Sequence, residues 1–211
     1  MFGLLVILFF SVIVHEVSHG LAALRNGDDT ARLMGRLTFN PLPHVDPIGT
    51  VVLPLLLILT AKISGGMIPV IGWAKPVPVN PFRFRDYRRG TLEVGAAGPL
   101  ANIVLALAFA LLFRLNGSGT AANVSGTAVL LYYAIFINFL LAAFNLIPIP
   151  PLDGSRIVSV FLPFEIQRQY ARVERYGIFL IFGLLFFGLF DLLLPLVNRL
   201  TGMAAGFQIP I

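Results

Sequence analysis

The sequence predicts an all-α membrane protein: a polytopic helical bundle of about four full spans, plus a re-entrant or hairpin segment that contains short extended chain. Hydrophobic residues make up 57% of the 211 residues and charged residues 12%, against about 45–50% and 25% in soluble domains. The mean hydropathy is +0.88. Because 211 residues suit one domain, we expect residues 1–211 to form a single integral-membrane domain.

The same composition excludes several classes of protein. A chain this apolar is not intrinsically disordered, and without cysteine it forms neither a disulfide framework nor a Cys-ligated metal site. Its net charge of +5 fits basic loops beside membrane helices better than a nucleic-acid surface. We therefore expect contact with a lipid bilayer, no nucleic-acid partner, and metal ligands drawn from His, Asp or Glu. The oligomeric state stays open.

Apolar segments of sufficient length set the number of spans, since a spanning helix needs about 20 mostly apolar residues. Four segments meet that length: residues 2–24, 92–115, 127–147 and 176–197. The first three are the expected core spans, and the fourth is the expected last span. A fifth apolar stretch, residues 48–71, is interrupted by prolines, glycines and Lys62. This pattern favours a hairpin over about residues 48–79 rather than one straight helix.

The distribution of basic residues indicates how this hairpin lies. If it enters and leaves on one side, 13 of the 15 Lys and Arg residues share that side, opposite Arg114 and Arg199. A single crossing divides them 10 to 5. Because cytoplasmic loops hold the excess of Lys and Arg, we expect the first arrangement, in the cell membrane, with both termini outside the cytoplasm. A double crossing and a shallow re-entrant loop both remain open.

The first apolar segment contains an HExxH motif at residues 15–19. On a helix, His15 and His19 share a face and can bind one zinc ion, with Glu16 beside them. Zinc held by two His needs a third protein ligand and keeps a position for water, whose proton a neighbouring Glu can accept. The alternative is a chance match, but ionisable side chains in a span are costly and usually functional. The motif therefore predicts two metal ligands and a general base.

Two aspartates are candidates for the third ligand. Asp153 follows the third span after a Pro-rich turn that lets the chain fold back into the protein. His15 lies nearer the C-terminal end of its span, and in the favoured topology Asp153 emerges on that same side. A helix N-cap or an ion-pair partner is the structural alternative for Asp153. Asp191, near the far end of the last span, is expected to pair with Arg199 or to lie at the surface.

Three motifs together resemble the core helices of the site-2 protease family of intramembrane zinc metalloproteases. They are HExxH at residues 15–19, Gly-Pro-Leu-Ala-Asn at residues 98–102 and Asn-Leu-Ile-Pro-Ile-Pro-Pro-Leu-Asp-Gly at residues 145–154. The chain is similar to compact members without a PDZ or CBS domain, although some relatives place another helix before the HExxH helix. The resemblance implies one Zn²⁺ per chain bound by His15, His19 and Asp153, and base catalysis by Glu16.

The resemblance also implies regulated intramembrane proteolysis, in which peptide bonds in or near the spans of membrane-protein substrates are hydrolysed. Two other functions remain open. A polytopic metal-ion transporter can use the same His and Asp residues as a transient ion site. An inactive relative can bind membrane peptides without cutting them.

Several further residues are candidates for contact with substrate. An Asn amide can donate to an oxyanion, hold a substrate backbone or bridge helices. The position of Asn145 before the Asp153 turn, together with the resemblance, favours a catalytic donor. Asn102 is a candidate for substrate binding, with helix packing equally open because small residues surround it.

The extended chain near residues 71–79 is expected to offer a strand edge to an unwound substrate, with Trp73 and Val77 as contact residues. His44, a lone loop histidine beside prolines, is expected to be structural, with a gating or auxiliary-ligand role as the alternative.

Overall fold

The computed structural model describes residues 2–52, 55–56, 58–60, 74–116 and 125–206. In these ranges the regular elements are helical: α1 (Phe2–Arg25), α2 (Thr30–Leu33), the 3-10 helix η1 (Leu42–His44), the π-helix η2 (Pro47–Val52), the 3-10 helix η3 (Pro81–Arg83), α4 (Tyr87–Leu115), α5 (Gly126–Asn145), α6 (Asp153–Ser159), α7 (Phe164–Glu174), α8 (Gly177–Phe186) and α9 (Leu189–Ala205). The prediction of an all-α chain is confirmed for this part of the protein.

Three helices in the described part of the chain, α1, α4 and α5, are long and apolar enough to cross a membrane. They coincide with the three predicted core spans. Helix α4 begins at Tyr87 rather than at residue 92 because Asp86 caps its first turn, accepting a hydrogen bond from the Arg89 N–H at 2.9 Å. The first turn of α4 is polar, so a search of the sequence for apolar stretches of spanning length begins after it.

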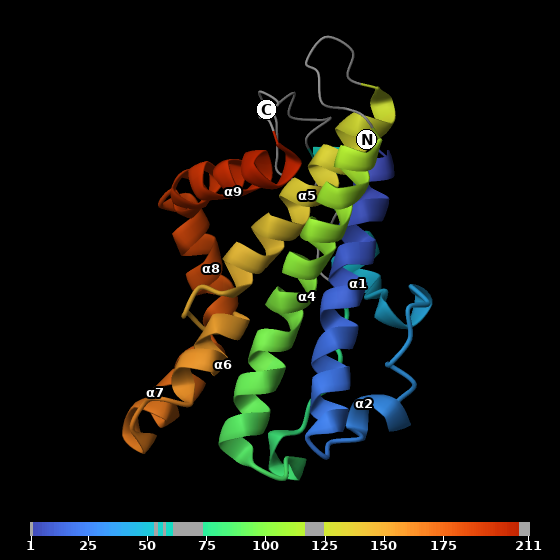
Figure 1. The fold of residues 1–211 in the computed structure, drawn as a ribbon. Coiled ribbons are helices and arrows are strands. Elements are labelled where there is room, and N and C mark those ends of the chain that lie inside the picture. Colours follow the sequence, from blue (N-terminus) through green and yellow to red (C-terminus); the bar gives the residue numbers. More distant parts are fainter. Residues whose placement is uncertain (1, 53–54, 57, 61–73, 117–124, 207–211) are drawn as a thin grey trace.

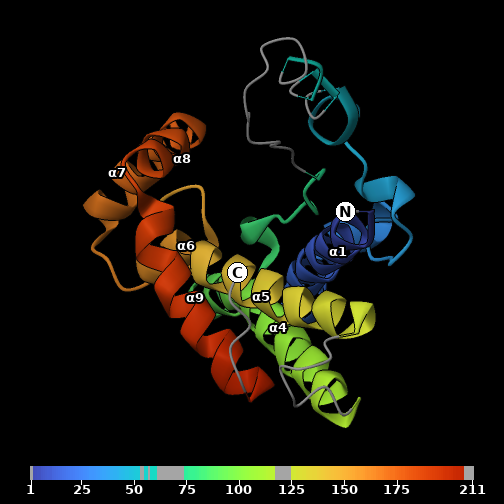
Figure 2. The same cartoon turned by 90° about the horizontal axis from the view of Figure 1, so that it is seen from above.

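The three spanning helices lie side by side and alternate in direction, with α4 between α1 and α5 (Figures 1 and 2). One buried cluster joins α4, α5 and α9: Ala106, Ala110, Phe113, Ala128, Tyr132, Ile135, Phe139, Val197 and Ala205. Alanines on α4 allow α5 to approach closely, and the rings of Phe113 and Tyr132 meet at 6.1 Å between centroids. This packing fixes α4 and α5 relative to each other, and α4 also packs on α1, the helix that carries the HExxH motif.

The predicted last span, residues 176–197, is divided into two helices. Helix α8 ends at Phe186 and α9 begins at Leu189, with Gly188 between them at φ +86°. That left-handed conformation suits glycine, which has no Cβ. Figure 1 shows α9 turning across the end of the bundle, where Arg114 donates to the carbonyls of Ala204 (2.7 Å) and Met203 (2.9 Å) near the C-terminus of α9. A count of four full spans is therefore not confirmed.

The predicted hairpin, residues 48–79, lies partly outside the described residues, and Trp73 is among those outside. Its return, residues 74–80, forms neither helix nor strand. Pro76 and Pro78 have no N–H, so in this stretch, hereafter the 74–80 segment, these two positions cannot donate to a paired strand. The Lys75 N–H donates to the His44 carbonyl at 2.9 Å. Lys75, near the end of the predicted hairpin, therefore lies beside His44, which precedes the start of the hairpin.

Asp28, in the loop after α1, holds the end of the 74–80 segment. Its side chain is fully buried, and it accepts hydrogen bonds from the Asn80 N–H (2.6 Å), the Thr30 N–H (3.0 Å) and the Thr30 hydroxyl. Burial raises the pKa of Asp28, but these hydrogen bonds and the positive charge of Arg83 outweigh it and leave the pKa below its ordinary value. The folded protein thus favours the ionised carboxylate.

We expect Asp28→Asn to loosen the 74–80 segment at neutral pH, because an amide removes the charge from three hydrogen bonds worth roughly 1.5–3 kcal/mol each. In the unsubstituted protein this stabilisation is present above the ordinary Asp pKa of about 3.9 and is lost as the pH falls through the lower folded value. Hydrogen-exchange protection of the Asn80 amide at pH 7 and pH 3 measures both effects. Asp29→Asn is the neighbouring control, and equal protection in Asp28→Asn would contradict the anchoring role.

Candidate metal centre

Two of the predicted ligands, His15 and His19, lie on the side of α1 that faces α4, and these two helices pack against each other. The face of α1 carries a residue of interest at every fourth position: Ser11, His15 and His19. The facing side of α4 has the same spacing: Val94, Gly98 and Asn102. Residues four apart on a helix lie one above the other, and the two helices run in opposite directions (Figure 1). His15 therefore meets Asn102, and His19 meets Val94.

The turn after α5 carries the third predicted ligand to the same place. Helix α6 begins at Asp153 and packs on α4. Gly154 permits the tight return of the chain, because a Cβ there would collide with the backbone oxygens of Leu146 and Ile147. The Pro-rich turn and this glycine together aim the Asp153 carboxylate at α1.

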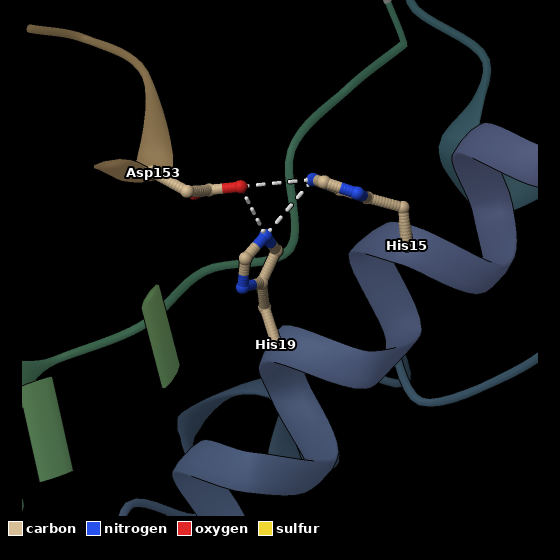
Figure 3. Close-up of side chains that lie close together, drawn as sticks. All are labelled: His15, His19 and Asp153. Carbon is tan, nitrogen blue, oxygen red and sulfur yellow. Dashed lines mark hydrogen bonds and ion pairs between the residues drawn. The ribbon is translucent and has the colours of Figure 1, made fainter. Parts of the chain in front are cut away.

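His15, His19 and Asp153 converge in the structure as the sequence predicts (Figure 3). The Oδ2 atom of Asp153 lies 3.1 Å from the Nε2 of His15 and 3.1 Å from the Nε2 of His19. The two Nε2 atoms are 3.1 Å apart. All three residues are buried, with exposed fractions of 7%, 6% and 7%. In the described part of the chain, this is the group of His and acidic residues that can hold a metal ion.

The hydrogen bonds behind the two imidazoles show that the three atoms suit a cation. The Nδ1 of His15 lies 2.6 Å from the Asn102 Oδ1, and the Nδ1 of His19 lies 2.7 Å from the Val94 carbonyl oxygen. Because both oxygens only accept, both Nδ1 atoms carry the proton, and both Nε2 atoms present a lone pair. The buried Asp153 Oδ2 likewise receives no hydrogen bond. Three lone pairs directed at one point need a positive charge between them.

The charge on Asp153 is consistent with a ligand. The carboxylate of Asp153 supplies the negative charge that two neutral imidazoles lack, so the three side chains together suit a divalent cation. Metal coordination requires the ionised form of this carboxylate.

Gly98 leaves the room that a cation needs between the imidazoles and α4. A Cβ at this position would lie 2.5 Å from the Cε1 of His15, 2.5 Å from the Nε2 of His19 and 2.6 Å from the Nε2 of His15. A side chain here would thus enter the space in front of both ligand nitrogens. The glycine of the 98–102 motif is explained by this contact.

Glu16, the predicted base, is half-buried on α1 beside the ligands and does not join the metal-binding group. Its Oε2 accepts a hydrogen bond from the Val77 N–H at 2.8 Å. The Val77 side chain is buried, so the 74–80 segment passes directly beside the HExxH motif. Two carboxylates of the α1 region, Glu16 and Asp28, hold this segment at two of its backbone amides.

The structure places the remaining predicted residues as follows. Asn102 is fully buried and bonded to His15, a position that supports a ligand-orienting role and leaves no surface for substrate. The Asn145 amide donates to the Leu141 carbonyl of its own helix at 2.9 Å, so it is not directed at the three ligands.

His44 is fully buried, and its Nε2 lies 2.9 Å from the Thr38 carbonyl oxygen, which favours the structural role. Asp191 is exposed in the first turn of α9.

Two buried polar residues near the ligands are not predicted by the sequence analysis. Ser11 and Asn138 are fully buried and bonded to each other at 2.9 Å, and Asn138 also accepts from Asn102 at 2.9 Å. The sequence contains an indication of each of these two residues. Ser11 lies four residues before His15 on the same helix face, and Asn138 is a polar residue inside an apolar span.

Comparisons with known proteins identify a family and several relatives. Residues 114–188 match the model of peptidase family M50. YwhC of Bacillus subtilis, named as a zinc metalloprotease, is 38% identical over 187 residues, which cover 87% of this chain and 79% of that protein. Rip2 of Mycolicibacterium smegmatis, also named as a zinc metalloprotease, is 32% identical over 190 residues, 90% of this chain and 66% of that protein. No solved structure matches the chain significantly.

A more distant relative extends the comparison to archaea. The zinc metalloprotease MJ0392 of Methanocaldococcus jannaschii is 24% identical over 159 residues, covering 75% of this chain and 34% of that protein. Together with apolar spans and a buried His-His-Asp group that can hold a metal ion, these names indicate a membrane metalloprotease. By its similarity to these proteins, the chain belongs to the site-2 protease family, peptidase family M50.

Proposed function

We propose that this protein is a zinc metalloendopeptidase that hydrolyses peptide bonds in or near the membrane-spanning segments of other proteins. The observation that carries the proposal is the convergence of three buried donor atoms from α1 and α6. Two neutral imidazoles and one carboxylate are a ligand set of catalytic zinc sites. The relatives are named as zinc metalloproteases, which supports zinc as the metal.

In this proposal Glu16 moves the proton of the reaction. Zinc, when bound by His15, His19 and Asp153, supplies Lewis acidity. The Glu16 carboxylate takes a proton from the attacking water and later delivers it to the leaving amine nitrogen. Because the Glu16 Oε2 accepts from the Val77 N–H, the Oε1 is the oxygen that would take the proton, and the hydrogen bond to Val77 can persist.

Asn145 remains a proposed donor to the oxyanion of the tetrahedral intermediate. Its amide must then turn away from the Leu141 carbonyl, to which it donates in this structure. The proposal for substrate contact rests on the 74–80 segment, because its Val77 amide already lies at the base. Substrate would pass along this segment, with Trp73 proposed as a further contact.

The proposed orientation puts the metal centre near the cytoplasmic side of the cell membrane and both termini on the other side. The Lys75–His44 hydrogen bond supports a hairpin that enters and leaves at one place. That topology places 13 of the 15 basic residues on the side where α1 ends.

Removal of the metal tests the proposed function. Purified protein in lipid nanodiscs is expected to cleave a model peptide containing one transmembrane helix, to lose this activity with a zinc chelator, and to regain it when zinc is restored. Cleavage is followed by mass spectrometry of the products, which also gives the position of the cut. Zinc-loaded protein that leaves a panel of such peptides intact, or activity that resists complete zinc removal, would overturn the proposal.

A further inference from the structure

A chain of buried hydrogen bonds runs from α5 to the metal centre. The Asn138 amide donates to the Ser11 hydroxyl (2.9 Å) and to the Ala134 carbonyl (2.9 Å). The Asn138 Oδ1 accepts from the Asn102 amide at 2.9 Å, and the Asn102 Oδ1 faces the His15 Nδ1 at 2.6 Å. Asn102, Asn138 and Ser11 each have an exposed fraction of 0%. Water therefore does not compete for these groups.

Backbone carbonyl groups determine which atom donates and which accepts in this series of hydrogen bonds. A carbonyl oxygen only accepts, so the end of Asn138 that faces the Ala134 carbonyl must be its NH₂ group. The Asn138 oxygen then faces Asn102, which must present its own NH₂ group there and toward the Ser11 carbonyl (3.4 Å). This leaves only the Asn102 oxygen for His15. Each amide has one orientation that satisfies its neighbours.

We propose that Asn102 and Asn138 are positioning residues that set the tautomer of His15 through this chain. With an oxygen opposite it, the Nδ1 of His15 carries the proton, and its Nε2 keeps the lone pair that points at Asp153. A reversed or missing Asn102 amide would let the proton move to Nε2 and block metal binding. Asn138 belongs to α5 and acts through Asn102. The inference rests on the proposed ligand role of His15.

His19 provides an internal comparison. Its Nδ1 donates directly to the Val94 backbone carbonyl at 2.7 Å, which no side-chain substitution removes. The two ligand histidines of α1 therefore reach the same tautomer by different means. Substitutions in the Asn chain are expected to change His15 and to leave His19 unchanged.

The tautomers are measured directly by ¹⁵N NMR of the zinc-free protein with labelled histidine, which contains only 3 His residues. In the unsubstituted protein, His15 and His19 are both expected to be protonated at Nδ1. In Asn102→Leu and Asn138→Leu, His15 is expected to become a mixture of both tautomers. Asn102→Asp is expected to retain the Nδ1 proton on His15, because a carboxylate oxygen accepts equally well.

Zinc affinity is the second readout, measured by competition with a chelator. Asn102→Leu and Asn138→Leu are expected to bind zinc about 10- to 100-fold more weakly. Asn198→Leu, which removes an Asn from α9 whose buried Oδ1 has no partner, is the matched control and is expected to bind zinc normally. Thermal unfolding shows whether each variant is folded.

The outcomes separate this inference from the proposed function. His15→Ala that binds zinc as tightly as the unsubstituted protein would overturn the metal assignment itself. If His15→Ala loses zinc while both Leu variants keep the affinity and the His15 tautomer, only the positioning role is wrong. If the Leu variants do not fold, the unsubstituted protein still decides the matter, because His15 without a proton at Nδ1 in the zinc-free state would overturn the inference.

Discussion

Replacement of Glu16 by Gln is expected to abolish peptide hydrolysis and to leave zinc bound. Gln cannot take a proton from water, and loss of a general base typically costs about 10²- to 10⁴-fold in rate. The metal should remain because its three ligands come from other residues. The fold should also remain, since the Gln side-chain oxygen can still accept from the Val77 N–H. The cleavage rate of the transmembrane peptide and the zinc content of the purified variant give the two measurements.

Glu93→Gln is the matched control for this experiment. Glu93 is also a glutamate on a spanning helix, and it accepts hydrogen bonds from Arg89 (2.7 Å) and Asn26 (2.8 Å). This variant is expected to cleave at close to the normal rate. A metal transporter predicts the opposite pattern, in which Glu16→Gln spares zinc flux into proteoliposomes and no form of the protein cleaves peptide. Normal cleavage by Glu16→Gln would remove Glu16 from the mechanism.

The three core spans are predictable because hydrophobicity alone determines them. Their ends are less so: the start of α4 depends on the Asp86 cap, which lies in a polar turn. The division of residues 176–197 is also hidden, because Gly188 is one small residue in a long apolar run and glycine is common in membrane helices. Apolar length predicts that a helix can span, but not that its chain stays straight.

The three metal ligands differ in how directly the sequence predicts them. His15 and His19 follow from helical spacing, whereas Asp153 is chosen by topology and by the family resemblance. The partners behind the ligands, Asn138 and Ser11, become evident only when α1, α4 and α5 are packed together. The contact between Glu16 and Val77 joins residues 61 positions apart. Tertiary structure, which sequence spacing does not encode, determines these contacts.

Gly98→Ala is expected to prevent zinc binding while the protein stays folded. The new methyl group would lie 2.5 Å from the His15 Cε1 and 2.5 Å from the His19 Nε2, so both rings must move. They are held from behind by Asn102 and by the Val94 carbonyl, and Gly98 lies between these two residues on the same face of α4. Either the rings lose those hydrogen bonds, or the methyl group occupies the space in front of the ligand atoms.

The expected loss of zinc affinity is at least as large as the roughly 10- to 100-fold that follows removal of a hydrogen bond supporting a ligand. Helix α4 itself should not be weakened, because alanine is about 1 kcal/mol more favourable than glycine inside a helix. Gly183→Ala in α8, where a Cβ meets nothing within 4 Å, is the control and should bind zinc normally. Chelator competition measures the affinity, and circular dichroism monitors the helices. Because the substitution adds one methyl group and removes no ligand, normal zinc binding by Gly98→Ala would mean that the two imidazoles do not face α4 as described.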